Sequence, residues 1–273
     1  MGEQPGYFAG PHGTPLFGAY HAPERAEGVP VLMAPALFEE RKSAYAALAG
    51  LARKLASQGH PVLRFDYRGS GESGGASAGR RWRDLAADLA AAKEHLARWT
   101  GARAVALAGL RLGATLALSE AARLEAATVV ALAPVAKGAA EVRLWRLRSK
   151  ARAELTGNTQ PAFGATVPPA SNVLDLDGFE VPPEFLEDVA GLDLLAAPPR
   201  LTCPALILQV SHRQTPSPDY QRLAKTLGPL ARLECLRLEP FWNRLDDVDT
   251  GALEERIGWF LGTARASSER VSG

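Results

Sequence analysis

Gly109-Leu110-Arg111-Leu112-Gly113 is the stretch of this sequence that decides the fold. The apolar run before it, residues 104–108, predicts a strand, and the small-residue-rich segment 112–123 predicts a helix. A sharp turn from strand to helix crowds the Cβ atoms around it, so the residues two before and two after its centre must be small. Glycines stand at both of these positions. The spacing therefore predicts a tight turn centred on Arg111.

Strands and helices alternate on both sides of this turn. An aromatic-rich hairpin, residues 7–20, opens the chain. Further strands are predicted at 30–34, 61–65, 128–133, 205–210 and 232–238, and further helices at 43–58, 81–99, 217–227 and 250–261. This alternation predicts a mostly parallel, doubly wound α/β sheet with right-handed crossovers and an N-terminal β-hairpin.

The alternation breaks between residues 137 and 200. This segment contains a Pro-rich region, 161–183, and a cationic stretch made of Arg143, Arg146, Arg148, Lys150 and Arg152. We expect residues 137–200 to form an inserted, partly helical cap over the carboxyl edge of the sheet. Residues 1–136 and 201–264 then form the two parts of the core, and residues 265–273 a disordered tail.

The central turn has the pattern of the nucleophile elbow of the α/β-hydrolase fold, Gly-x-Ser-x-Gly, with Arg111 in the place of serine. A second landmark agrees, because the segment 65–73, Phe-Asp-Tyr-Arg-Gly-Ser-Gly-Glu-Ser, resembles a loop of that superfamily. The sequence thus predicts an α/β-hydrolase fold with an inserted cap.

The other two positions of a serine-hydrolase triad also hold unexpected residues. The superfamily's chain order is nucleophile, acid, histidine. None of the five histidines lies beyond His212, and the last predicted strand is followed by Glu239-Pro240-Phe241-Trp242. The loop 211–215, where the acid is expected, carries no carboxylate. The sequence therefore indicates that this is not an ordinary serine hydrolase.

Five stretches resemble the exosortase A system-associated hydrolases, particularly the type 2 group. They are Phe38–Ser43, Gly109–Ala114, Leu144–Arg148, Asp177–Val181 and Pro240–Trp242. The most specific are the arginine elbow and the Pro-Phe-Trp, where ordinary hydrolases have serine and histidine. The resemblance implies the fold. It implies no particular reaction, because the word hydrolase in the family's name comes from the fold.

A cation at the N-terminus of a helix is unfavourable unless a negative partner neutralises it. The candidate partners within the chain are Glu39, Glu40 and Asp66. A pair between Arg111 and one of them would fill the position of a hydrolase active site. The alternative is a ligand with a carboxylate, phosphate or acyl anion, held by Arg111 as a bidentate clamp. Lys42 is able to assist either arrangement.

Three functions stay open. The first is binding of a small anionic or acyl-containing ligand under the cap, by Arg111, Glu40, Lys42, Asp66 and Trp242. The second is hydrolysis or acyl transfer on an ester, thioester or amide, with Arg111, His212 and either Glu39 or Glu40 as catalytic residues. The third is a pseudoenzyme scaffold whose cap binds a partner protein.

Composition argues against several classes of partner and location. The net charge of +1 gives no indication of nucleic-acid binding, and two distant cysteines make neither a disulfide framework nor a zinc site. The N-terminus lacks the pattern of a signal peptide, and no apolar run is long enough to span a bilayer. We expect a cytoplasmic protein without a metal or cofactor.

Overall fold

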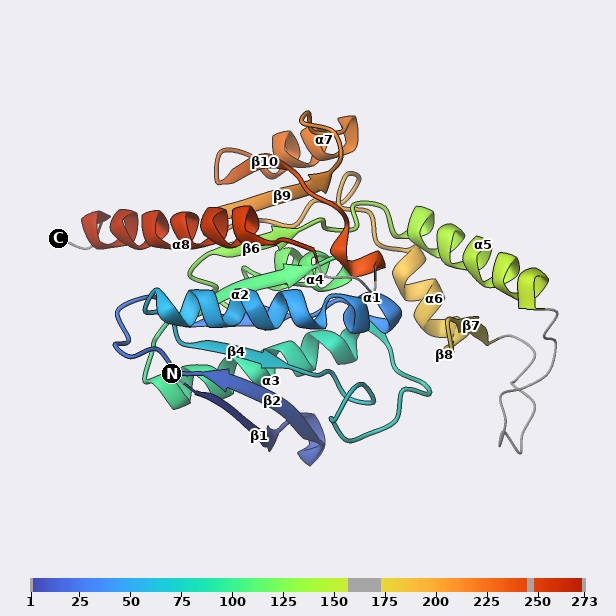
Figure 1. Cartoon of the computed structure of the whole chain (residues 1–273), viewed down its shortest axis with the longest axis horizontal. Helices are drawn as coiled ribbons and strands as arrows, with labels where there is room; N and C mark the ends of the chain where they lie inside the picture. Colours follow the sequence, from blue (N-terminus) through green and yellow to red (C-terminus); the bar gives the residue numbers. More distant parts are fainter. Residues whose placement is uncertain (1, 157–172, 245–247, 272–273) are drawn as a thin grey trace.

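The structure is a computed structural model that describes residues 2–156, 173–244 and 248–271. Its centre is an eight-stranded sheet in the order β1-β2-β4-β3-β5-β6-β9-β10 (Figure 1). Strands β1 and β2 form an antiparallel hairpin, β2 is antiparallel to β4, and all pairs from β4 to β10 are parallel. The strands are β1 (Glu3–Ala9), β2 (Pro15–His21), β3 (Val31–Ala34), β4 (Val62–Phe65), β5 (Ala106–Leu110), β6 (Val129–Leu132), β9 (Ala205–Ser211) and β10 (Ala231–Arg237).

Helices cover both faces of this sheet, which is why its inner strands are continuous apolar runs. One face packs on α2 (Tyr45–Ser57) and α8 (Gly251–Val271), which cross in front of the sheet in Figure 1. The other face packs on α3 (Trp82–Thr100), α4 (Leu112–Glu120) and α7 (Pro218–Leu227). The layers confirm the predicted doubly wound α/β architecture.

The inserted segment lies beyond the carboxyl ends of the parallel strands, at the right of Figure 1. It contributes α5 (Gly138–Thr156), the hairpin of β7 (Leu174–Leu176) and β8 (Phe179–Val181), and α6 (Pro183–Ala190). A bidentate ion pair fastens it to the core, with Arg81 Nε and Nη2 donating to Asp188 at 2.7 and 2.6 Å. Much of the Pro-rich region, residues 157–172, lies outside the described residues.

Two expectations about helix ends need correction. The helix predicted from residue 43 is preceded by a separate helix, α1 (Phe38–Ser43), and the two are divided at Ala44. Helix α8 continues to Val271, ten residues beyond the end predicted at residue 261. The segment 263–271 contains no Pro or Gly, and its two Ala and two Arg favour a helix, which allows α8 to continue.

Candidate functional site

The strand β5 and the helix α4 meet in the tight turn that the glycines predicted. Arg111 has φ 56° and ψ −120°, a strained conformation for a residue with a side chain. A Cβ atom on Gly109 would overlap the backbone of Gly113, and one on Gly113 would overlap the carbonyl oxygens of Ala34 and Pro35. Both glycines are therefore required by the close backbone approach, as the spacing predicted.

All three guanidinium nitrogens of Arg111 are engaged by the protein. Nε donates to Glu40 Oε1 at 2.9 Å, and Nη2 donates to Glu141 Oε2 at 2.8 Å. Nη1 donates to the carbonyl oxygen of Ala133 at 3.3 Å. The arginine side chain is only 14% exposed. The positive charge of Arg111 is therefore already matched by two carboxylates of the protein.

An aromatic pair closes this cluster where a hydrolase carries its histidine. The short 3₁₀ helix after β10, Phe241–Asn243, buries both Phe241 and Trp242. The guanidinium carbon of Arg111 lies 5.7 Å from the centroid of the Trp242 ring, which is within the range of a cation–π contact. Trp242 thus stabilises the arginine from the side of β10.

The two glutamates and the arginine form a buried, coupled group. Burial raises the pKa of Glu40; Arg111 opposes this effect and the charge of Glu141 adds to it. Burial acts to lower the pKa of Arg111, but Glu40 and Glu141 outweigh it and hold that pKa above its usual value. Glu141 Oε1 is buried and has no hydrogen-bond partner within the described part of the chain. The group is held together by charge, with one carboxylate oxygen left unsatisfied.

The other predicted site residues lie apart from Arg111. Glu39 and Lys42 pair with each other at 3.8 Å on the outside of α1, where the Lys42 side chain is 64% exposed. His212 Nδ1 lies 3.2 Å from Glu239, with 69% of the histidine side chain exposed. Of the predicted residues, the structure brings only Glu40 and Trp242 to Arg111.

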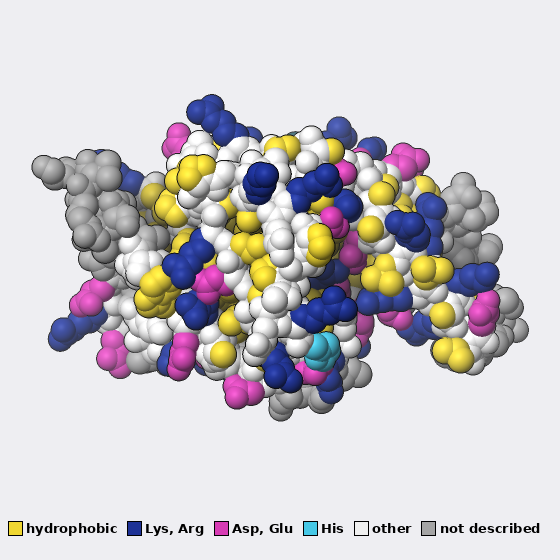
Figure 2. Space-filling view, turned by 90° about the horizontal axis from the view of Figure 1, so that it is seen from above, with side chains coloured by type: hydrophobic (Ala, Val, Ile, Leu, Met, Phe, Trp, Pro, Cys, Tyr) yellow, Lys and Arg dark blue, Asp and Glu magenta, His cyan; other side chains and the backbone are white. Residues whose placement is uncertain are grey.

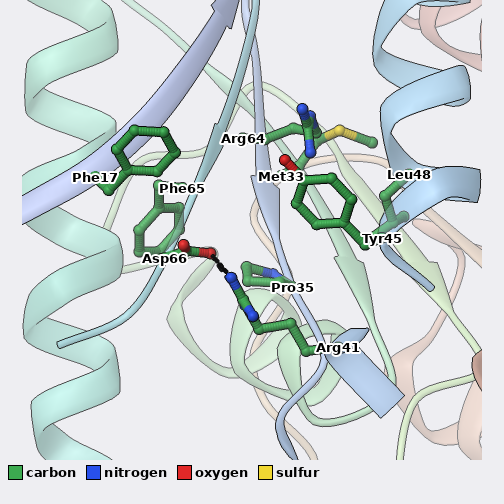
Figure 3. A pocket seen from close by; sticks show the side chains of 9 residues that line it. All are labelled: Phe17, Met33, Pro35, Arg41, Tyr45, Leu48, Arg64, Phe65 and Asp66. Atoms are coloured by element: carbon green, nitrogen blue, oxygen red, sulfur yellow. Dashed lines mark hydrogen bonds and ion pairs between the residues drawn. The ribbon is translucent and has the colours of Figure 1, made fainter. Parts of the chain in front are cut away.

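Asp66 is bound to a different arginine. Arg41 Nε and Nη2 donate to Asp66 Oδ1 at 3.0 and 2.6 Å, and this pair borders a small pocket between β2, β3, β4 and α2 (Figure 3). The pocket measures about 30 Å³, so it has room for little more than one water molecule. Its other walls are mostly apolar, including Phe17, Met33 and Tyr45. Asp66 is thus part of a structural ion pair.

Glu141, in the first turn of α5, was not among the predicted site residues. The signal available in the sequence was slight: one carboxylate just ahead of the cationic stretch that begins at Arg143. Its importance appears only when α5 is placed over the elbow. There Glu141 joins the cap to the core through Arg111.

An open cleft of about 870 Å³ lies between α1 and the cap helix α5, next to this cluster. Glu40 and Trp242 line it as well as the predicted residues Glu39 and Lys42, whereas Arg111 does not. The cap contributes Arg148, Ala151, Arg152, Leu155 and Asp177. On the face seen in Figure 2, Lys and Arg side chains are interspersed with acidic ones, and hydrophobic side chains show at the cap end. The lining of the cleft thus combines charged side chains of both signs with apolar surface.

Residues 37–213 match the family described as "Serine aminopeptidase, S33". The match includes the elbow, the loop after β4 and the whole cap. The chain belongs to this family. No curated protein sequence matches the chain significantly.

Solved esterase structures share the fold of this family member. Est1E from Butyrivibrio proteoclasticus with bound ferulic acid is 15% identical and has a TM-score of 0.69, with 96% of this chain and 99% of that chain covered. The esterase domain of a Rhodothermus marinus protein is 22% identical with a TM-score of 0.65, over 95% and 98%. A Pyrococcus furiosus esterase is 16% identical with a TM-score of 0.62, over 97% and 90%. These similarities establish the α/β-hydrolase fold.

Residues 2–156, 173–244 and 248–271 contain neither a candidate metal site nor a candidate membrane span. No three His, Cys, Asp or Glu side chains converge there in an arrangement able to hold a metal ion. None of the helices there is both long enough and apolar enough to cross a bilayer.

Proposed function

We propose that this chain binds a small anionic or acyl-containing ligand in the cleft between α1 and the cap, without serine chemistry. One observation carries the proposal: the elbow holds an arginine paired with both Glu40 and Glu141, directly beside a cleft whose lining includes the cations Lys42, Arg148 and Arg152. In this proposal the elbow provides no nucleophile, and the cleft between α1 and the cap serves to bind the ligand.

Two of the positions that carry a serine hydrolase's catalytic residues hold other residues in this chain. Arg111 occupies the nucleophile position, and β10 is followed by Phe241 and Trp242 instead of histidine. His212 is exposed at the end of β9 and paired with Glu239. A serine hydroxyl without a neighbouring base is a weak nucleophile, which argues against acyl transfer through any serine at this edge.

Arg148 is the residue we propose to hold the ligand's negative group. It is half-buried, lines the cleft, and forms no ion pair with a carboxylate in the described part of the chain. A guanidinium forms two parallel hydrogen bonds with a carboxylate or phosphate, which gives both orientation and affinity. Lys42, on the opposite side of the cleft, adds a second, more solvated cation.

Arg111 and Glu40 are assigned a positioning role in this proposal. Arg111 links Glu40 of α1 with Glu141 of α5, so it fixes the distance between the two walls of the cleft. Trp242 supplies an apolar floor beside them, suited to an acyl chain. The ligand is then recognised by Arg148 and Trp242, with Arg111 holding the frame.

The membership of the exosortase-associated type 2 group is also proposed. In support, stretches that carry the resemblance meet in space: Arg111 contacts Glu40 and Trp242, and the Phe38 ring lies 5.5 Å from Trp145 and 6.0 Å from Phe179. Motifs far apart in sequence thus form one continuous cluster. A cytoplasmic location is part of the same proposal.

Binding of octanoate, which combines a carboxylate with an acyl chain, tests the role of Arg148. Calorimetric titration is expected to show saturable binding that Arg148→Met weakens by about tenfold or more, since a lost charge-assisted pair amounts to at least one factor of ten. The exposed Arg213→Met is the matched control and is expected to leave affinity unchanged. Equal affinity in the parent and the Arg148→Met protein, or no saturable binding, would refute the proposal.

A fluorophosphonate probe tests the absence of serine chemistry. We expect no labelled serine after incubation with the native protein, whereas a serine esterase treated in parallel is labelled fully. Labelling of the native protein that is lost after heat denaturation would show an activated serine. This result would overturn this part of the proposal. Turnover of an octanoyl ester lost in Glu40→Gln would instead support the non-serine hydrolase.

A further inference from the structure

We propose that the pocket beside Arg80 binds a tetrahedral oxyanion, a phosphate or sulfate group, at a site separate from the cleft. The pocket has a volume of about 120 Å³ and lies where the loop after β4 meets the cap hairpin β7–β8. A water molecule occupies roughly 30 Å³ of liquid, so a group of about four or five heavy atoms fits.

Arg80 is a buried cation without a carboxylate of its own. Its residue surface is 5% exposed, and its guanidinium lies 5.7 Å from the Phe38 ring and 5.5 Å from the Phe185 ring. Nη1 donates to the Arg68 carbonyl oxygen at 3.2 Å and to Ser70 Oγ at 2.8 Å. Nε and Nη2 donate to no group within residues 2–156, 173–244 and 248–271. These two nitrogens are therefore left for another acceptor.

The two aspartates whose charges act on Arg80, Asp88 and Asp84, are engaged by another arginine. Asp88 accepts from Arg68 Nη2 at 2.7 Å and from Arg68 Nε at 2.9 Å, and Asp84 lies 3.8 Å from Arg68 Nη1. Asp88 still acts on Arg80 through its charge, but burial dominates and lowers the Arg80 pKa. A buried guanidinium that lacks a close counter-ion is costly, and a bound anion removes that cost.

Hydroxyl groups complete the donor set around the pocket. Ser70 Oγ accepts from Arg80, which leaves its own proton for donation, and Ser77 also lines the pocket. Neither hydroxyl donates a hydrogen bond to any side chain or backbone group in the described part of the chain. One guanidinium together with two hydroxyl donors on the pocket wall suits the several acceptor oxygens of a tetrahedral oxyanion better than the two of a planar carboxylate.

The other charged residues at the pocket do not neutralise Arg80, so Arg80 is the cation that is left to bind an anion. Arg41 is neutralised by Asp66 at 2.6 Å. Glu180, on the exposed strand β8, is the carboxylate among the lining residues. The ring of Phe38 stands between this pocket and the space bounded by Glu40 and Arg148, so the two sites are physically distinct.

Calorimetric titration with inorganic phosphate in a low-salt, chloride-free buffer tests the site. We expect saturable binding at one site, an affinity at least about tenfold lower for Arg80→Met, and no change for the cleft variant Arg148→Met. Acetate, as the planar anion, is expected to bind at least about tenfold more weakly than phosphate. Non-saturable phosphate binding, or acetate binding equal to phosphate binding, would overturn the assignment.

Glu180→Gln tests the same site without touching the core. Removing the carboxylate from the rim is expected to raise phosphate affinity a few-fold, because like charges repel across the pocket. Glu255→Gln makes the same charge change at an exposed position of α8 and is expected to have no effect. If the two variants shift the affinity equally, the effect is one of net charge and the site is refuted. This outcome is independent of whether octanoate binds in the cleft.

Discussion

Arg111→Met lowers the free energy of unfolding by about 3–5 kcal/mol in our expectation, because it strands Glu40 and Glu141 as buried carboxylates without their cation. Glu40 is 8% exposed and Glu141 is 7% exposed, so both carboxylates are largely shielded from water. Urea unfolding of the parent and the variant at neutral pH measures the difference.

The pH dependence of this deficit identifies its cause. Burial already raises the pKa of Glu40 in the parent, and removal of Arg111 raises it further. A carboxyl group whose pKa is raised in the folded state favours folding while it is protonated. This contribution to the free energy of unfolding is lost as pH rises through the folded-state pKa. The deficit of Arg111→Met is therefore expected to shrink as pH falls from 8 towards the ordinary glutamate value of 4.5.

An exposed arginine provides the control for that experiment. Arg123 pairs with Glu120 on α4 and its side chain is 57% exposed, so Arg123→Met is expected to cost less than about 1 kcal/mol at any pH. Equal losses for the two variants, or a pH-independent loss for Arg111→Met, would show that the cluster is not held by charge.

Gly113→Ala is the second substitution with a large expected effect. The new Cβ atom would overlap the carbonyl oxygens of Ala34 and Pro35, which are backbone atoms and cannot rotate away. We expect a loss of about 3 kcal/mol or more, or failure to fold, since overpacking a rigid site costs at least this much at its upper range. Thermal unfolding measures it, at roughly 2–4 °C per kcal/mol for a chain of this size.

The same substitution in an open helical position is the matched control. Gly262 lies within α8, and a Cβ added there meets nothing within 4 Å. Gly262→Ala is expected to gain about 0.5–1 kcal/mol from helix propensity alone. Since both changes are Gly→Ala within a helix, the difference between them measures the close approach at the elbow. Similar unfolding temperatures for the two variants would contradict the steric argument.

The sequence predicted the sheet and its helices well because their signals are local. Apolar runs between Gly and Pro residues marked the strands, and the glycines around Arg111 marked the turn. The division at Ala44 was missed, because α1 begins at Phe38 with φ 55°, a conformation that no residue pattern announces. The end of α8 was missed because a polar segment without Pro or Gly suits a helix and a tail equally well.

The chain's own order of residues determined that an arginine stands at the elbow, that no histidine follows the last strand, and that glycines must flank the turn. Which carboxylates neutralise Arg111 was decided only by tertiary structure. Glu39 and Glu40 are neighbours in sequence, and their positions on α1 leave Glu39 half-buried and Glu40 buried. Asp66 is held by Arg41, and Glu141 arrives from a helix 30 residues away. Buried charges select their partners by where packing places them, and that placement is not a local property of the sequence.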